Sequence, residues 1–394
     1  MTIERELHEA TLLVRGGLER SAFDETAEGL FLTSGYVYGS AAEAEAAFAG
    51  DHERYIYSRY GNPTVSMFEE RLRLLEGAES CMATASGMAA VFASLASLVE
   101  AGDKVVGSRA LFGSCHVILS EILPRLGVET VQVDGTSLQA WEQALAGGAR
   151  AVFLETPSNP GLQIIDLAAV ADMAHAAGAL VIVDNVFASP ILQKPLEFGA
   201  DVVVYSATKH IDGQGRVLGG AVLSTEQFKT DYLMPFTRHT GPSLSPFNAW
   251  VLLKGMETLR LRVDAMARSA HTLAEQLEHQ ASIRHVGYPM LASHPQFDLA
   301  KRQMTAGGTV LTIDVENKQN AFAFMDALQL FDISNNVGDS KSLATHPATT
   351  THRRIGADGR ALVGIGDGMI RLSIGLEDPQ DLYHDLEAAL SQVP

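Results

Sequence analysis

Two short apolar runs, each followed abruptly by polar residues, constrain the fold of this chain more than any other feature. Leu180–Val183 is followed by Asp184, and Val202–Tyr205 is followed by Ser206 and then by Lys209. Runs rich in β-branched residues that are apolar throughout are typical of parallel strands buried on both faces. Because parallel strands end at the same edge of a sheet, we expect the acid and the lysine to lie near each other.

Strands alternating with helices are expected through the first two thirds of the chain, which indicates a mostly parallel sheet with crossover connections. The glycine-rich segment after Lys209, residues 213–220, suits neither a strand nor a helix. Further strands are expected at 80–84, 103–107, 128–133 and 151–154, and helices at 4–14, 41–47, 65–75, 138–146 and 167–177.

A second structural unit is expected after Pro242–Pro246. The helical pattern from Phe247 to about His279 is long for a globular helix, so we expect a break in it where one domain gives way to the next. Beyond it the pattern predicts an α+β unit with strands at 309–315 and 369–374 and helices at 320–328 and 378–390. The expected parts are an N-terminal arm (1–60), a larger domain (61–255) and a C-terminal domain (256–394).

Composition excludes several classes of function. The net charge of -18 argues against a nucleic-acid partner. No apolar run is long enough to cross a bilayer, and the polar N-terminus differs from a targeting peptide. Cys81 and Cys115 form no CxxC motif, and the 13 histidines show no paired ligand spacing, so neither a disulfide framework nor a metal site is expected. A reducing cytoplasm is the expected compartment.

An acid and a lysine at neighbouring strand ends match the two chemical needs of pyridoxal 5'-phosphate (PLP). The aldehyde of PLP needs an amine, and its pyridinium nitrogen needs an anion that keeps it protonated so that the ring accepts electrons. Lys209 and Asp184 would meet these needs. A structural ion pair at the sheet edge is the alternative.

A turn that could hold a phosphate precedes the alanine-rich helix expected to run to Leu98. Ser86 is a good N-cap, Gly87 allows a ligand to approach the backbone, and Met88 follows. The amides and dipole of a helix start favour an anion. An ordinary capped strand-to-helix turn is the alternative.

Arg371 lies within an otherwise apolar expected strand. A buried arginine is costly unless it meets an anion, and its planar fork suits a carboxylate. A structural salt bridge is the alternative.

The stretch DNVFASPILQKPLEFGADVVVYSATKH resembles the lysine region of the Cys/Met-metabolism family of PLP enzymes, and the resemblance extends over nearly the whole chain. The family contains cystathionine γ-synthases, cystathionine lyases, methionine γ-lyases and homoserine-ester sulfhydrylases. The resemblance implies PLP fold type I, the fold of aspartate aminotransferase. The PLP-binding domain (61–255) would contain a mostly parallel seven-stranded sheet, and a smaller α+β domain would follow at the C-terminus.

The resemblance also implies roles for individual residues. Lys209 would carry the cofactor and serve as general acid and base, and Asp184 would hold the ring nitrogen. Phe112 stands where relatives commonly have tyrosine; it has no hydroxyl, so only ring packing is assigned to it. The remaining assignments are Ser86, Gly87, Met88, Ser206 and Thr208 to the phosphate, Asn159 to the phenolic oxygen, and Ser342 and Arg371 to the substrate.

The end of the arm resembles the family signature Y-x-R-x-x-N-P-T, in which the tyrosine and arginine reach the phosphate in the neighbouring subunit. Carried over, these are Tyr57 and Arg59, and each active site would need two chains. The arm is too small to hold a core of its own. The family forms tetramers built as dimers of dimers. Simple interface packing is the alternative.

Within the family, the run Asp339–His352 together with Phe112 is most similar to sulfhydrylases that act on succinyl esters. We therefore expect γ-replacement that makes L-homocysteine and succinate from O-succinyl-L-homoserine and sulfide. A cystathionine γ-synthase, which uses cysteine, is the alternative. A γ-lyase is less favoured, because methionine γ-lyases usually have cysteine in place of Ser114.

Two alternatives come from other classes of function. A catalytically inactive PLP fold is disfavoured by Lys209, Asp184 and Arg371. A nicotinamide enzyme is disfavoured because no GxGxxG motif follows an expected strand with an acid downstream.

Overall fold

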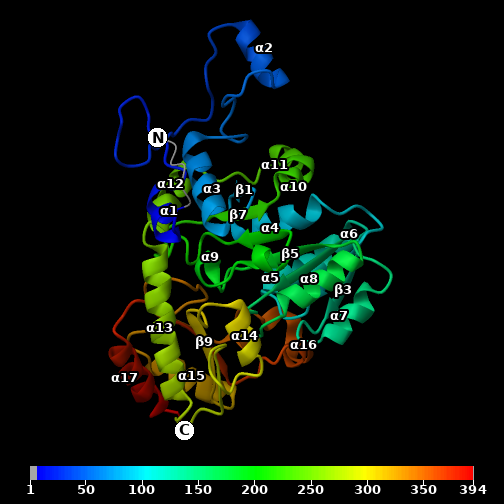
Figure 1. The fold of residues 1–394 in the computed structure, drawn as a ribbon. Coiled ribbons are helices and arrows are strands. Elements are labelled where there is room, and N and C mark those ends of the chain that lie inside the picture. Colours follow the sequence, from blue (N-terminus) through cyan, green and yellow to red (C-terminus); the bar gives the residue numbers. More distant parts are fainter. Residues whose placement is uncertain (1–6, 394) are drawn as a thin grey trace.

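Seven strands covered by helices on both faces form the larger part of the structure, a computed structural model that describes residues 7–393. Their order is β1-β7-β6-β5-β4-β2-β3, and β7 runs antiparallel to both neighbours, so the predicted mostly parallel seven-stranded sheet is confirmed (Figure 1). The strands are β1 (Ser80–Thr84), β2 (Lys104–Ser108), β3 (Glu129–Val133), β4 (Ala151–Glu155), β5 (Leu180–Asp184), β6 (Val202–Tyr205) and β7 (Gly220–Ser224).

Alternate side chains of each central strand pack into different cores, which explains why the strands are apolar throughout. Val181 and Val183 lie in one core, whereas Ile182 lies in the core on the opposite face. Helices α3 (Pro63–Glu76), α7 (Leu138–Leu145), α8 (Leu167–Ala176) and α12 (Pro246–Met256) contribute to the first core. Helices α4 (Gly87–Ala96), α5 (Gly113–Val117) and α6 (Leu123–Arg125), with the π-helical turn η1 (Ile118–Ile122), contribute to the second.

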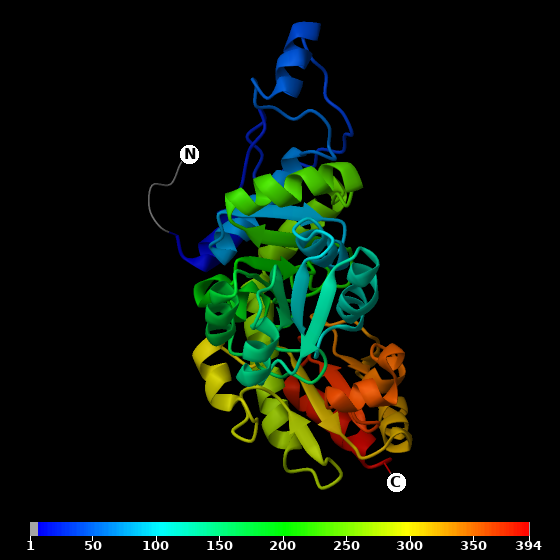
Figure 2. The same ribbon diagram turned by 90° about the vertical axis from the view of Figure 1, so that its right-hand side faces the viewer.

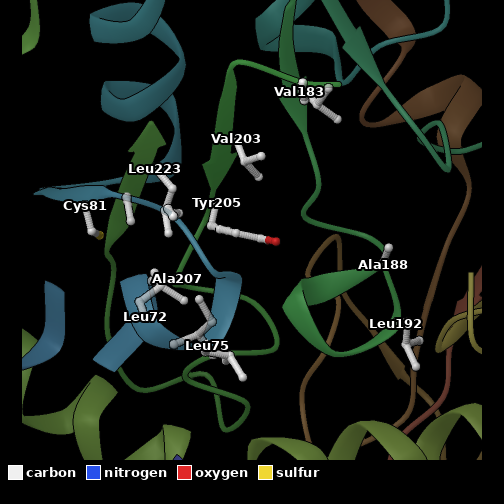
Figure 3. Packing of buried hydrophobic residues seen from close by; sticks show 14 of the residues in the cluster. Leu72, Leu75, Cys81, Val183, Ala188, Leu192, Val203, Tyr205, Ala207 and Leu223 are labelled. Carbon is white, nitrogen blue, oxygen red and sulfur yellow. The ribbon is translucent and has the colours of Figure 1, made fainter. Parts of the chain in front are cut away.

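Tyr205 at the end of β6 carries a polar group into the first core. It belongs to the same buried cluster as Leu72, Leu75 and Leu223 (Figure 3). Its hydroxyl donates to Glu76 Oε2 at 2.7 Å and accepts from the Asn185 amide at 2.7 Å. The hydroxyl is therefore satisfied although the residue is only 2% exposed.

The expectation that the glycine-rich segment after Lys209 joins no strand is wrong at its end, because β7 begins at Gly220. A Cβ at this position would lie 2.2 Å from the Ser86 carbonyl oxygen. Glycine is required there because β7 passes directly against the turn that precedes α4. Short helices flank this part of the sheet: α9 (Ser189–Leu192), η2 (Pro195–Phe198), α10 (Glu226–Phe228), η3 (Lys229–Leu233) and α11 (Met234–Thr240).

A five-stranded sheet of order β10-β11-β12-β9-β8 forms the second unit. The predicted long helix is divided after Met256, and α13 (Leu259–Leu277) runs along the second unit (Figure 1), so the expected break is confirmed. The strands are β8 (His285–Gly287), β9 (Val310–Asp314), β10 (Asp332–Ile333), β11 (Leu343–Thr345) and β12 (Met369–Ser373). The other helices are α14 (Phe297–Gln303), α15 (Lys318–Ala327), η4 (Pro347–Thr349), η5 (Arg353–Ile355), α16 (Gly356–Leu362) and α17 (Pro379–Leu390). The exact domain boundaries stay a prediction.

The N-terminal arm carries α1 (Glu9–Arg15) and α2 (Ala41–Ala49), and α2 stands well away from both sheets (Figures 1 and 2). The part of the first expected helix at residues 4–6 lies outside the described residues. Large apolar side chains of the arm are exposed, including Phe23 at 89% and Val37 at 90%. Phe31, Leu32 and Phe48 of the arm are also exposed, and a concentration of exposed apolar side chains in one segment is typical of a contact surface.

A buried arginine, Arg71, links the N-terminal arm to the larger domain through hydrogen bonds. The Arg71 guanidinium, on α3, donates to Glu28 Oε1 at 2.5 Å and to the carbonyl oxygens of Gly16 and Leu253 at 2.9 and 3.3 Å. Glu28 also accepts from Lys254 Nζ at 2.8 Å. One side chain thus joins two points of the arm to α3 and α12.

Replacing Arg71 by alanine is expected to lower the free energy of unfolding by about 3–5 kcal/mol, because it leaves a buried carboxylate and two carbonyls without this donor. Arg73→Ala on the same helix is the matched control, since the Arg73–Glu70 pair is partly exposed. The control is expected to cost less than about 1 kcal/mol. Urea denaturation of both variants measures the difference, and equal losses would contradict this role of Arg71.

Candidate active site

A cavity of ≈ 230 Å³ lies at the carboxyl ends of β4, β5 and β6. This is the edge of a parallel sheet at which ligands bind in open α/β folds. Ten of the residues that the sequence indicated line this cavity: Ser86, Gly87, Met88, Phe112, Asn159, Asp184, Ser206, Thr208, Lys209 and Arg371.

Asp184 is the acid of this cavity and is only 7% exposed. Its Oδ1 accepts a hydrogen bond from the Val186 backbone amide at 3.1 Å. Burial raises the pKa of Asp184 to about 6, against the opposing effects of that hydrogen bond and of the Lys209 charge. A cationic group bound beside the carboxylate would favour its ionised form.

Glu155, at the end of β4, lies directly beside Asp184 in the paired strands. Its Oε2 accepts from the Phe112 backbone amide at 2.7 Å and so fixes the start of α5. Burial and the neighbouring Asp184 raise the pKa of Glu155 well above its usual range. Sequence reasoning assigned Glu155 no role; its place at a strand end beside Asp184 was the available signal.

Lys209 Nζ donates a hydrogen bond to Asn336 Oδ1 at 2.6 Å. Burial, reinforced by the charge of Arg371, lowers the pKa of Lys209 to about 8, although Asp184 opposes the shift. No ion pair between Lys209 and Asp184 occurs within residues 7–393, so the simple structural ion pair is not what the structure shows. Sequence reasoning missed Asn336, which lies just before the run Asp339–His352.

The predicted capped turn is present at the start of α4. The Ser86 hydroxyl caps the helix by accepting from the Ala89 amide at 3.2 Å. A Cβ on Gly87 would lie 2.5 Å from Ser206 Cβ, so only glycine allows this approach. The Thr208 hydroxyl bonds both backbone groups of Gly219, whereas the Ser206 hydroxyl makes no hydrogen bond among the described residues. Binding of a phosphate here stays a prediction.

Arg371 is 2% exposed, and no acidic side chain pairs with it in the described part of the chain. Nη1 donates to Asn159 Oδ1 at 2.9 Å, and Nη2 donates to the Asn335 carbonyl at 2.8 Å. Nε is buried without a partner among the described residues. Burial lowers the pKa of Arg371 to about 10, so the guanidinium stays charged at neutral pH. The structural salt bridge is therefore absent, and a ligand carboxylate fits this cation.

Three of the indicated residues lie outside the cavity. Tyr57 is 43% exposed, and the Arg59 guanidinium lies 4.7 Å from the ring centroid of Tyr60, so one chain alone does not bring them to the site. Ser342 donates to Glu377 Oε2 at 2.9 Å and accepts from the Gly375 amide at 2.9 Å. The substrate role of Ser342 stays a prediction, and within residues 7–393 Lys209 Nζ donates its hydrogen bond to Asn336 and not to Ser342.

No group of three or more potential metal ligands gathers in residues 7–393, and no helix there is long and apolar enough to span a membrane. The acidic and basic residues that line the cavity are Glu155, Asp184, Lys209 and Arg371.

Known proteins resemble this chain along nearly its whole length. A family model described as Cys/Met metabolism PLP-dependent enzyme matches residues 10–391. O-succinylhomoserine sulfhydrylase of Mycobacterium tuberculosis is 60% identical over 97% of this chain and 96% of its own, and the Pseudomonas aeruginosa enzyme of the same name is 48% identical over 97% and 94%. A Campylobacter jejuni crystal structure that carries N'-pyridoxyl-lysine-5'-monophosphate superimposes with a TM-score of 0.93 at 31% identity, covering 98% of this chain and 100% of its own.

The lowered pKa of Lys209 predicts how fast the chain without cofactor takes up PLP at different pH values. Only the neutral amine attacks an aldehyde, so the rate should rise with pH and level off above about 8, not near the ordinary 10.5. Arg371→Met removes a cationic neighbour, which raises the pKa and moves the midpoint to higher pH. The growth of visible absorption after mixing measures both profiles. A midpoint near 10.5, or a downward shift in the variant, would contradict the assignment.

Proposed function

Because the chain belongs to the family of Cys/Met metabolism PLP-dependent enzymes, we propose that it makes L-homocysteine and succinate from O-succinyl-L-homoserine and sulfide. The observation that carries this proposal is the identity with two O-succinylhomoserine sulfhydrylases across nearly the whole chain. The expected family, fold type I and cofactor are confirmed by the same comparisons.

The residues present fit PLP on their own chemistry. Lys209 supplies a partly buried amine of lowered pKa, and Asp184 supplies a buried carboxylate. The amides at the start of α4 and the unengaged Ser206 hydroxyl suit a phosphate. Phe112 lines the same cavity and suits packing on a ring. The buried Arg371 Nε still lacks a hydrogen-bond acceptor in the described chain, as a carboxylate site requires.

When bound, PLP supplies an electron sink next to the Cα of an amino acid. Arg371 would hold the α-carboxylate, and Asp184 would hold the ring nitrogen. Lys209 Nζ would remove the Cα proton and then exchange protons at Cβ, for which its lowered pKa is suited. Overall, the Cγ–O bond breaks, succinate leaves with the electron pair, and sulfide forms the Cγ–S bond.

Asn336 would position Lys209 for these proton transfers, because its side-chain oxygen holds Nζ at 2.6 Å. The roles of the ten cavity residues are proposals that rest on this geometry and on the family resemblance. Cystathionine γ-synthase activity, with cysteine in place of sulfide, is the alternative within the same cavity, and γ-elimination by a lyase is the other.

Product identity tests the proposal. The holoenzyme is given O-succinylhomoserine with sulfide, with cysteine, or with no nucleophile, and the products are separated by chromatography. We expect homocysteine to form with sulfide much faster than cystathionine forms with cysteine. Preferred formation of cystathionine, or mainly 2-oxobutyrate and ammonia, would overturn the choice of reaction while leaving the cofactor assignment intact.

We further propose that a second copy of the chain completes each site, in a dimer that pairs again into a tetramer. The exposed apolar residues of the arm support this dimer. Tyr57 and Arg59 support it too, because neither residue lines the Lys209 cavity of its own chain. Co-expressed Arg59→Ala and Lys209→Ala chains should then regain about a quarter of the activity. About half of the dimers are mixed when chains pair at random, and one of the two sites in each mixed dimer is intact. No recovery above that of the separate variants would contradict shared sites.

The cytoplasm remains the proposed compartment, because Cys81 and Cys115 are both buried free thiols. Cell fractionation would locate the protein, and its recovery from an oxidising compartment would oppose this proposal.

A further inference from the structure

A second cavity adjoins the first and shares Phe112, Lys209 and Asn335 with it. Its volume is ≈ 500 Å³, compared with ≈ 230 Å³ for the first. Because Lys209 lies where the two meet, an amino acid bound at Lys209 and Arg371 can extend its side chain into the second cavity. This cavity therefore suits the part of the substrate that leaves.

The charge of the second cavity is positive. Arg354 and Lys209 are its charged lining residues, and no acidic residue of the described chain lines it. Ser114, Thr351 and Asn336 add polar groups. A lining of this composition favours an anion over a neutral group.

Arg354, on the turn η5, is held at the rim by one carboxylate. Its Nη2 donates to both oxygens of Glu121 at 2.9 Å each, while Nε and Nη1 make no hydrogen bond with residues 7–393. The two side chains are 68% and 38% exposed. An exposed ion pair contributes little to stability, so a ligand carboxylate can replace Glu121 at small cost.

We propose that Arg354 binds the distal carboxylate of the succinyl ester and that Glu121 holds the guanidinium in place until the ester binds. The inference rests on the proposed function, since a succinyl ester carries a second carboxylate and an acetyl ester does not. Arg371 takes the α-carboxylate at the other end. Arg354 is thereby the residue that selects a succinyl over an acetyl ester.

The test compares O-succinylhomoserine and O-acetylhomoserine, each with sulfide, in three variants of the holoenzyme. Arg354→Gln should raise KM for the succinyl ester by about tenfold or more, because a charge-assisted hydrogen bond is lost. Its KM for the acetyl ester should stay unchanged. Arg353→Gln is the matched control, because Arg353 is exposed and does not line the cavity, and it should alter neither KM.

Glu121→Gln removes the competing carboxylate and should lower KM for the succinyl ester by about two- to threefold. A lowered KM would not arise from damage to the fold. Equal changes for both esters in Arg354→Gln, or no change for either, would overturn the inference.

Binding of succinate alone separates this inference from the proposed reaction. Calorimetry with the holoenzyme should show succinate binding that Arg354→Gln weakens by about tenfold and Arg353→Gln does not. If the unaltered enzyme converts neither ester, the proposed function fails, and the calorimetry still decides the role of Arg354. Equal succinate affinity in both variants would overturn it.

Discussion

Burial of opposite charges at one edge of the sheet is the constraint on which the site depends. β5 and β6 are covered on both faces, so the chain can place polar groups only where these strands end. Burial there raises the pKa of Asp184 and lowers that of Lys209, because it disfavours the charged form of each group. A bound ligand group of opposite charge would favour the charged form again. The cost of burying them is offset when the cofactor binds.

The second unit completes the site from the other side. Arg371 on β12 reaches the cavity and bonds Asn159 and Asn335, while Asn336 holds Lys209. Residues from both sheets are thus joined in a single network of hydrogen bonds around one cavity. A change in how the two units pack would move Arg371 and Asn336 relative to Lys209, so the packing of the two units determines the geometry of the cavity.

The sequence predicted the elements whose signal is local. Continuous β-branched runs predicted β5 and β6, and the cap at Ser86 with Gly87 predicted the turn before α4. It did not predict β8, β10 or β11, which have two or three residues each and depend on their neighbours for pairing. Glu155 and Asn336 were missed for a related reason: their contacts, with Phe112 and Lys209, join residues distant in sequence. The hydrogen bond from Ser342 to Glu377 could not be predicted either, because it also joins residues that are far apart in sequence.

At the edge of the seven-stranded sheet, Lys209 is the one amine that we propose to carry the cofactor. Borohydride reduction of the purified holoenzyme fixes the cofactor on the amine that holds it, and peptide mass spectrometry then locates the label. We expect a phosphopyridoxyl group on Lys209 and on no other lysine of the chain. A label on a different lysine, or none in a protein that contains PLP, would contradict it.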